Sequence, residues 1–132
     1  MSEQIDSRKQ DTQKQQAQFW LDYAQQLAAA IRYVEALAAI ERAITQDSTN
    51  VEAWYVRGTC LAMLARYDEA LQSFAHALSL NDLYVPAWDG KAWVLGILGR
   101  RDEAITANER ALELDPHYYQ AQKRHERLAA PE

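Results

Sequence analysis

Residues that make turns are scarce in this sequence, whose 132 residues include only four glycines and three prolines. An all-β fold needs many turns between short strands, so this scarcity disfavours such a fold and favours helices with short connections. The one cysteine, Cys60, excludes an internal disulfide, and no group of Cys and His residues has the spacing of metal ligands. We therefore expect no metal, no cofactor and a reducing compartment, the cytoplasm.

Long apolar runs and an excess of basic charge are also missing. No stretch approaches the ~18 consecutive apolar residues of a transmembrane helix. The polar residues 1–16 lack the apolar core of a signal peptide. The formal net charge of -5 argues against nucleic acid as the main partner. We expect a cytoplasmic protein that neither inserts into a membrane nor binds nucleic acid.

Internal repeats organise what is present. Trp20, Trp54 and Trp88 are separated by steps of 34 residues. Five further sets of residues keep the same step, and each set forms one column of the repeat: Ala24, Gly58 and Ala92; Leu27, Leu61 and Leu95; Glu35, Glu69 and Glu103; Ala36, Ala70 and Ala104; and Ala43, Ala77 and Ala111. A fixed period of this size predicts stacked units, each a small supersecondary structure.

Each unit is expected to contain two helices. In the middle unit Trp54, Gly58 and Leu61 follow the spacing i, i+4, i+7, so they share one helix face. The stretch "ARYDEA" interrupts this pattern, and its Asp68 and Glu69 stand where negative charge favours the start of a second helix. Small residues in the alanine and glycine columns would let the two helix backbones approach closely.

The columns resemble the tetratricopeptide repeat family, whose pattern combines Trp, Leu-Gly, Tyr, Ala, Phe and a later Pro. The middle unit reads Trp54-x-x-Arg57-Gly58-x-x-Leu61 and then Ala70-x-x-x-Phe74. The resemblance implies an all-α fold, an alpha-alpha superhelix (solenoid) of three helix-turn-helix units with a seventh, capping helix. The expected units are residues 17–50, 51–84 and 85–118, preceded by a polar tail over 1–16 and followed by the cap over 119–132.

The two ends differ from the repeats. Residues 1–16 are rich in Gln and charge without apolar periodicity, so we expect the first ten to be disordered, and Asp11 or Thr12 could cap an early start of the first helix. The segment is either a bare extension, or it folds back on the domain or docks a partner. At the other end we expect one helix over 116–129, with Asp115 as its N-cap.

The contact between the third unit and the cap can also be anticipated. Ala121, Leu128 and one of Tyr118 or Tyr119 would face the third unit. Asn108 stands where Ile40 and Phe74 stand in the earlier units, which predicts a looser or more polar contact with the cap.

A binding groove follows from helix geometry and from the resemblance. If Trp54 faces its own second helix, the opposite stripe of each first helix points outward, and such stripes line a concave groove in tetratricopeptide stacks. The candidate groove residues are Leu21, Asp22, Gln25, Glu52, Tyr55, Val56, Thr59, Met63, Asp89, Trp93 and Ile97. This groove would be apolar with negative charge, suited to a peptide with apolar anchors and a Lys or Arg.

Trp93 stands out among these residues because the repeat does not require an aromatic there. Its column reads Gln25, Thr59, Trp93. We interpret it as an exposed anchor for a partner. The alternative is a Trp partly covered by the cap helix.

Two further surfaces were weighed. Five cations near the C-terminal end predict a secondary basic surface, either a solvated face or a site for an acidic partner: Arg100, Arg101, Lys123, Arg124 and Arg127. Co-chaperones of the family grip acidic peptide ends with a clamp of Lys, Asn and Arg. The corresponding positions here are Leu21, Gln25, Val56, Pro86 and Gly90, so we expect no such clamp.

The sequence contains no phosphate-binding loop and no nucleophile motif, so we do not expect an enzyme. His76, His117 and His125 lie where surface or interface histidines are typical. The resemblance implies an adaptor, scaffold or assembly factor that binds a peptide segment of another protein. One alternative is a secretion-type chaperone that holds an export substrate. Another is a self-associating structural module, which leaves a homo-oligomer open.

Overall fold

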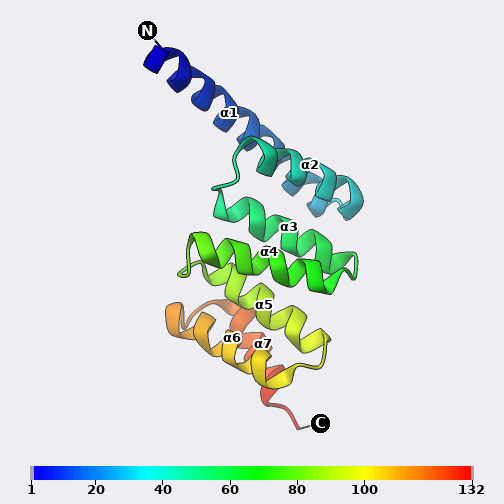
Figure 1. The fold of residues 1–132 in the computed structure, drawn as a ribbon. Helices are drawn as coiled ribbons and strands as arrows, with labels where there is room; N and C mark the ends of the chain where they lie inside the picture. Colours follow the sequence, from blue (N-terminus) through cyan, green and yellow to red (C-terminus); the bar gives the residue numbers. More distant parts are fainter. Residues whose placement is uncertain (1, 132) are drawn as a thin grey trace.

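The computed structural model describes residues 2–131, which form seven α-helices and no strand (Figure 1). The helices are α1 (Ser2–Ala29), α2 (Tyr33–Gln46), α3 (Val51–Met63), α4 (Tyr67–Leu80), α5 (Val85–Ile97), α6 (Arg101–Leu114) and α7 (Tyr119–Ala129). The all-α prediction is therefore confirmed.

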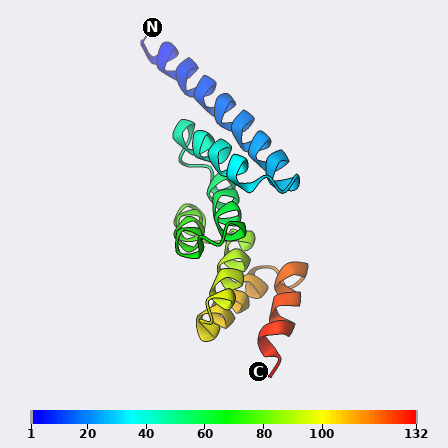
Figure 2. The same ribbon diagram turned by 90° about the vertical axis from the view of Figure 1, so that its right-hand side faces the viewer.

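The helices pack in sequential pairs. The most extensive contacts join α1 to α2, α3 to α4 and α5 to α6, and each pair then contacts the next through its second helix. The first helices of neighbouring pairs also touch, so α1, α3, α5 and α7 follow one another along one side of the stack. Figure 2 shows the pairs succeeding each other along the long axis of the molecule. This arrangement is the predicted solenoid of three helical pairs with a cap.

The turns inside the pairs repeat as closely as the helices do. Ile31, Ala65 and Gly99, again 34 residues apart, all have positive φ angles of 63°, 60° and 75°. The next residue in each turn donates its backbone N–H to the carbonyl of the leucine column: Arg32 to Leu27, Arg66 to Leu61 and Arg100 to Leu95. Satisfying the last carbonyls of a helix in this way ends it and redirects the chain into the second helix.

The centre of the core is the ring of Phe74, which is fully buried. Two glycines of the neighbouring first helices enclose it. A Cβ atom added at Gly58 of α3 would lie 2.6 Å from Cε1 of Phe74, and one added at Gly90 of α5 would lie 2.7 Å from the same atom. The absence of side chains at these two positions leaves room for the phenyl ring, so α3, α4 and α5 pack closely around it.

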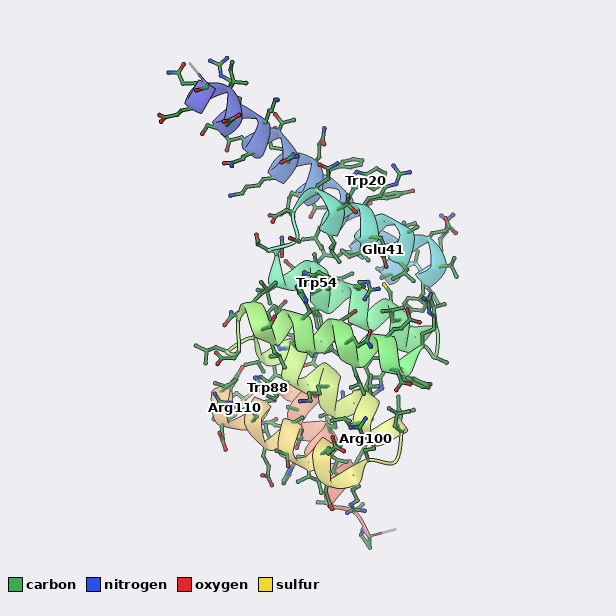
Figure 3. The ribbon with its side chains drawn as sticks, in the orientation of Figure 1. Trp20, Glu41, Trp54, Trp88, Arg100 and Arg110 are labelled. Carbon is green, nitrogen blue, oxygen red and sulfur yellow. The ribbon has the colours of Figure 1, made fainter. Side chains whose placement is uncertain are left out.

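The repeated tryptophans belong to the wall between paired helices, as predicted. The indole of Trp54 lies 3.8 Å, centroid to centroid, from the ring of His76 on α4. Its Nε1 donates to the carbonyl of Ser48 at 2.9 Å, and Nε1 of Trp88 donates to that of Asp82 at 2.7 Å. Trp20, Trp54 and Trp88 succeed one another along the stack (Figure 3). The indoles of Trp54 and Trp88 thus also fix the loops that precede α3 and α5.

The N-terminal segment differs from the expectation. Instead of a disordered stretch, residues 2–16 continue α1 as a helix, which extends past the stack (Figure 1). Their side chains are exposed, and burial begins at Ala17. The segment lacks Gly and Pro and is rich in Gln, Lys, Arg and Glu, all of which favour helix. The packed part of α1 supplies the nucleus from which the exposed turns propagate.

The start of the cap helix was also placed wrongly. Asp115 is the C-cap of α6, and Tyr118 is the N-cap of α7. The reason is a loop that recurs with the period: in each unit an Asp or Asn accepts a hydrogen bond at 3.0 Å from the backbone N–H two residues later. The three pairs are Asp47 with Thr49, Asn81 with Leu83, and Asp115 with His117. The carboxylate of Asp115 therefore serves the loop and does not cap α7.

The contact between the third unit and the cap is polar at its centre. Nδ2 of Asn108 donates to the carbonyl of Ala121 at 2.9 Å, and its Oδ1 is buried without a hydrogen-bond partner among the described residues. Ala121 is fully buried, Leu128 packs on the core of α5 and α6, and Tyr119 is exposed. The predicted facing residues and the more polar contact are thus confirmed.

Candidate functional site

The predicted groove residues separate into surface and core. Eight of them are exposed or half-buried on the first helices: Asp22, Gln25, Glu52, Tyr55, Thr59, Met63, Trp93 and Ile97. Leu21, Val56 and Asp89 are buried instead, which corrects their assignment as groove surface. The reason is that adjacent first helices contact one another. A stripe at one edge of the outward face is therefore covered by the neighbouring helix.

Two apolar side chains remain open at the C-terminal ends of the first helices. Met63 ends α3 and is 46% exposed, and Ile97 ends α5 and is 47% exposed. The two residues are one period apart, so they occupy equivalent places on successive helices. Together they form an apolar rim that other parts of the described chain do not cover.

Two exposed carboxylates lie on α1 and α3, at the N-terminal side of the stack. Oε1 of Glu52 accepts a hydrogen bond from Nε2 of Gln25 at 2.6 Å, and Oδ1 of Asp22 accepts one from Nε2 of Gln18 at 2.8 Å. Neutral amides position both exposed carboxylates without neutralising them. A cationic group of a ligand could therefore pair with either carboxylate.

Three tyrosines gather near the N-terminal ends of α3, α5 and α7. The rings of Tyr55 and Tyr84 have centroids 5.8 Å apart, and Tyr55 also lies 5.9 Å from the Phe74 ring. Burial raises the pKa of Tyr55, and it raises the pKa values of Tyr84 and Tyr118 to about 12. All three hydroxyls are therefore protonated at neutral pH, and they offer uncharged donors beside apolar rings.

Sequence reasoning left Tyr84 unnoticed and considered Tyr118 only as a contact between the cap and the third unit. Both are N-cap residues, of α5 and α7, in the column that begins with Asn50 at the N-cap of α3. Asn50 caps its helix by accepting from the backbone of Ala53, whereas the tyrosines make no such bond. An aromatic in a capping column was the signal that could have identified them.

A buried ion pair lies next to the tyrosines. Nε of Arg124 donates to Oδ1 of Asp89 at 2.8 Å, and Nη2 donates to Oδ2 at 3.2 Å. The two side chains are only 16% and 9% exposed. The expectation that Arg124 faces solvent is therefore wrong, because a carboxylate buried under α7 requires a compensating cation and α7 supplies it.

A hollow of about 300 Å³ opens between α5 and α7. Its lining joins groove residues to cap residues: Ala92, Trp93, Gly96, Ile97, Arg124, Arg127 and Leu128. Trp93 is half-buried, packs partly on the core cluster and borders the hollow with its remaining surface. Trp93 is therefore partly a core contact and partly an open wall of the hollow.

The five cations of the predicted secondary basic surface do not act as one patch, because four of them bind separate partners. Arg100 pairs with Glu103 at 2.7 Å, and Lys123 lies 3.6 Å from the carboxylate of Glu126. Arg101 donates to the carbonyls of Leu128 and Ala130, and Arg124 is the partner of Asp89. Arg127, which borders the hollow, forms no ion pair among residues 2–131.

Other chemistry is sparse in the part of the chain that the structure describes. It holds no group of three or more His, Cys, Asp or Glu residues placed to bind a metal ion. None of its helices is both long and apolar enough to cross a membrane. Cys60 is fully buried, and burial raises the pKa of its thiol to about 11, so it remains protonated at neutral pH.

Comparison with solved structures agrees with this fold. The chain is similar to the TPR domain of Arabidopsis OM64, with a TM-score of 0.85 and 19% identity over 88% of this chain and 96% of that chain. It is also similar to the second TPR of Spaghetti (RPAP3) bound to the HSP90 peptide SRMEEVD, with a TM-score of 0.83 and 25% identity over 88% of this chain and 100% of that chain.

A third similar structure is the second TPR domain of human RPAP3 in complex with the HSP70 peptide SGPTIEEVD. Its TM-score is 0.81, with 21% identity over 92% of this chain and 99% of that chain. No curated protein sequence matches the chain.

Family models match most of the sequence. The model described as "Anaphase-promoting complex, cyclosome, subunit 3" matches residues 6–77, more than half of the chain, and the model "Tetratricopeptide repeat" matches residues 85–118. The columns of the sequence and the stacked helical pairs agree with these matches, and the chain belongs to the tetratricopeptide repeat family.

Proposed function

We propose that the protein binds a peptide segment of another protein along the face formed by α1, α3 and α5, and so acts as an adaptor, scaffold or assembly factor. One observation carries this proposal: Met63 and Ile97 expose equivalent apolar side chains on successive first helices. The tyrosine cluster of Tyr55, Tyr84 and Tyr118 adds aromatic surface to the same face. Unpaired apolar and aromatic surface of this kind is typical of interaction sites.

The similar RPAP3 domains support peptide binding, since they are bound to HSP90 and HSP70 peptides with acidic EEVD ends. The ligand proposed here differs from those peptides. The five positions that correspond to the cationic clamp hold Leu21, Gln25, Val56, Pro86 and Gly90. We propose a peptide with apolar anchors at the rim and a Lys or Arg opposite Asp22 and Glu52.

A peptide selected from a displayed random library should lose about tenfold or more in affinity when Met63 is replaced by serine. Burying one apolar anchor contributes ~1.5–3 kcal/mol, and tenfold corresponds to about 1.4 kcal/mol. Fluorescence anisotropy of the labelled peptide measures the change. Val34→Ser, which alters an exposed apolar side chain on α2, is the matched control and should leave affinity unchanged. Equal weakening by both variants would contradict the groove assignment.

A second candidate function, self-association, is favoured by the outer face of the first unit. Phe19 is 62% exposed, whereas the equivalent residues Ala53, Ala87 and Ala121 are buried in later units. Phe19 stacks on Tyr23 with ring centroids 6.3 Å apart. In later units the preceding helix packs beside this column, so the first unit presents an aromatic surface where a further helix could pack.

If a second copy covers this face, the mass from light scattering should rise with concentration, and Phe19→Ala should shift the protein towards the monomer. The melting temperature at low concentration should not fall, since Phe19 is largely exposed. Val34→Ala serves as the control. A constant monomer mass for the unmodified protein over the whole concentration range excludes this second function.

A further inference from the structure

The hollow between α5 and α7 is lined by both apolar and cationic side chains. Trp93, Ile97 and Leu128 contribute apolar surface to the lining. Ala92 and Gly96 are small and leave space on the α5 side. Arg124 and Arg127 enter from the cap helix. Figure 2 shows α7 beside the last helical pair, and α7 contacts both α5 and α6. This volume of about 300 Å³ is enough for one bulky side chain with a polar group beside it.

Arg124 is held in place before any ligand arrives. Asp89 occupies its Nε and Nη2 donors, so the guanidinium plane is fixed and largely removed from water. A guanidinium carries five N–H donors. Nη1 of Arg124 makes no hydrogen bond to any of the residues 2–131. Donors fixed in this way bind an anion at a lower entropic cost than those of a free side chain.

Arg127 adds a charge that nothing in the described chain neutralises. It is exposed, borders the same hollow and has no ion-pair partner among the described residues. The exposed carboxylates Asp22 and Glu52 lie at the opposite end of the face, on α1 and α3. The face is therefore bipolar, negative near α1 and positive near α7.

We propose that this hollow binds an apolar side chain that is adjacent to an Asp or Glu carboxylate in the partner peptide. The apolar side chain covers Trp93 and Ile97, and the carboxylate accepts hydrogen bonds from Arg124 and Arg127. The inference rests on the proposed function and gives the bound peptide a direction. Its acidic, apolar end lies at α7 and its basic end lies at α1.

Blocked tripeptides test the preference for a carboxylate. Acetyl-Glu-Leu-Glu-amide, titrated into the ¹⁵N-labelled full chain, should shift the Trp93 indole and Arg124 Nε–H resonances in NMR spectra. Acetyl-Gln-Leu-Gln-amide should bind about fivefold or more weakly, since neutral acceptors form weaker bonds to arginine. Acetyl-Lys-Leu-Lys-amide should not shift these resonances, because like charges repel.

Two variants locate the binding. Arg127→Gln should weaken the Glu peptide about fivefold or more, whereas Lys123→Gln, which removes the same charge from the same helix outside the hollow, should change affinity by less than about twofold. Gly96→Leu should abolish binding by filling the hollow. A Cβ at Gly96 meets no atom within 4 Å, so this variant should stay folded.

The outcomes separate this inference from the proposed function. Equal binding of the Glu, Gln and Lys peptides, equal effects of Arg127→Gln and Lys123→Gln, or shifts confined to residues outside the hollow would each overturn the inference. Absence of any binding by the tripeptides would overturn it as well. None of these results affects selection of longer peptides that depend on Met63. Failure of that selection would instead count against the groove as a whole.

Discussion

Replacing Phe74 with alanine is expected to lower the free energy of unfolding by about 3–5 kcal/mol, the range for truncating a buried aromatic in a core. The ring is fully buried and fills the space that Gly58 and Gly90 leave on the two neighbouring first helices. Because the backbones on either side belong to different helical pairs, the cavity cannot close without moving one pair against the next. Urea unfolding followed by circular dichroism measures the loss.

The two glycines of α5 supply the control for this packing argument. Gly90→Ala should destabilise by about 1–3 kcal/mol, because its Cβ would overlap the trapped ring. Gly96→Ala meets open space and should be neutral or stabilise by up to about 1 kcal/mol, as alanine is the better helix former. Similar effects of the two alanine substitutions would contradict the interpretation of Phe74 as the lock between pairs.

Replacing Arg124 with leucine is expected to destabilise the protein by about 3–5 kcal/mol. The change leaves the carboxylate of Asp89, which is 9% exposed, without a cation among the described residues. The cap helix should detach first, since this ion pair joins α7 to α5. Loss of hydrogen-exchange protection confined to α7, together with a lower midpoint of urea unfolding, measures the effect.

The double variant Asp89→Leu with Arg124→Leu should lose less stability than Arg124→Leu alone, since no buried charge remains unpaired. Lys123→Leu provides the surface comparison. Its pair with Glu126 is exposed on both sides, so the loss should not exceed about 1 kcal/mol. If Arg124→Leu lowers the free energy of unfolding no more than Lys123→Leu does, the ion pair with Asp89 does not hold the cap helix in place.

The sequence alone determined the fold and its dimensions. Columns that recur every 34 residues correspond to contacts that the units repeat. The leucine column accepts the turn hydrogen bond, Trp54 and Trp88 of the tryptophan column bind the preceding loop, and each glutamate of its column accepts from an arginine three residues earlier. Periodicity reports such contacts because each unit must bury the same face against the next. The polar contact of Asn108 was readable for the same reason, as a departure within a column.

The site followed from the sequence only in part. Helix phase identified the exposed Met63 and Ile97, yet it also assigned Leu21 and Val56, which the neighbouring helices cover. The helical spacing of residues shows which of them share a face of one helix. Whether that face is buried depends on the angle at which a neighbouring helix packs against it. The helical N-terminal extension escaped notice because favourable helix propensity leaves no apolar period to detect.

Only the tertiary structure decided where the charges meet. The bond between Asp89 and Arg124 joins a residue of the last repeat to the cap, and no other unit contains that pair. The 34-residue period reveals only contacts that recur in each unit, so a contact that occurs once cannot be detected from it. The same holds for the hollow between α5 and α7, which exists because a single cap helix brings Arg124 and Arg127 against Trp93. The repeat thus determined the architecture, and unrepeated packing at its end decided the character of the candidate site.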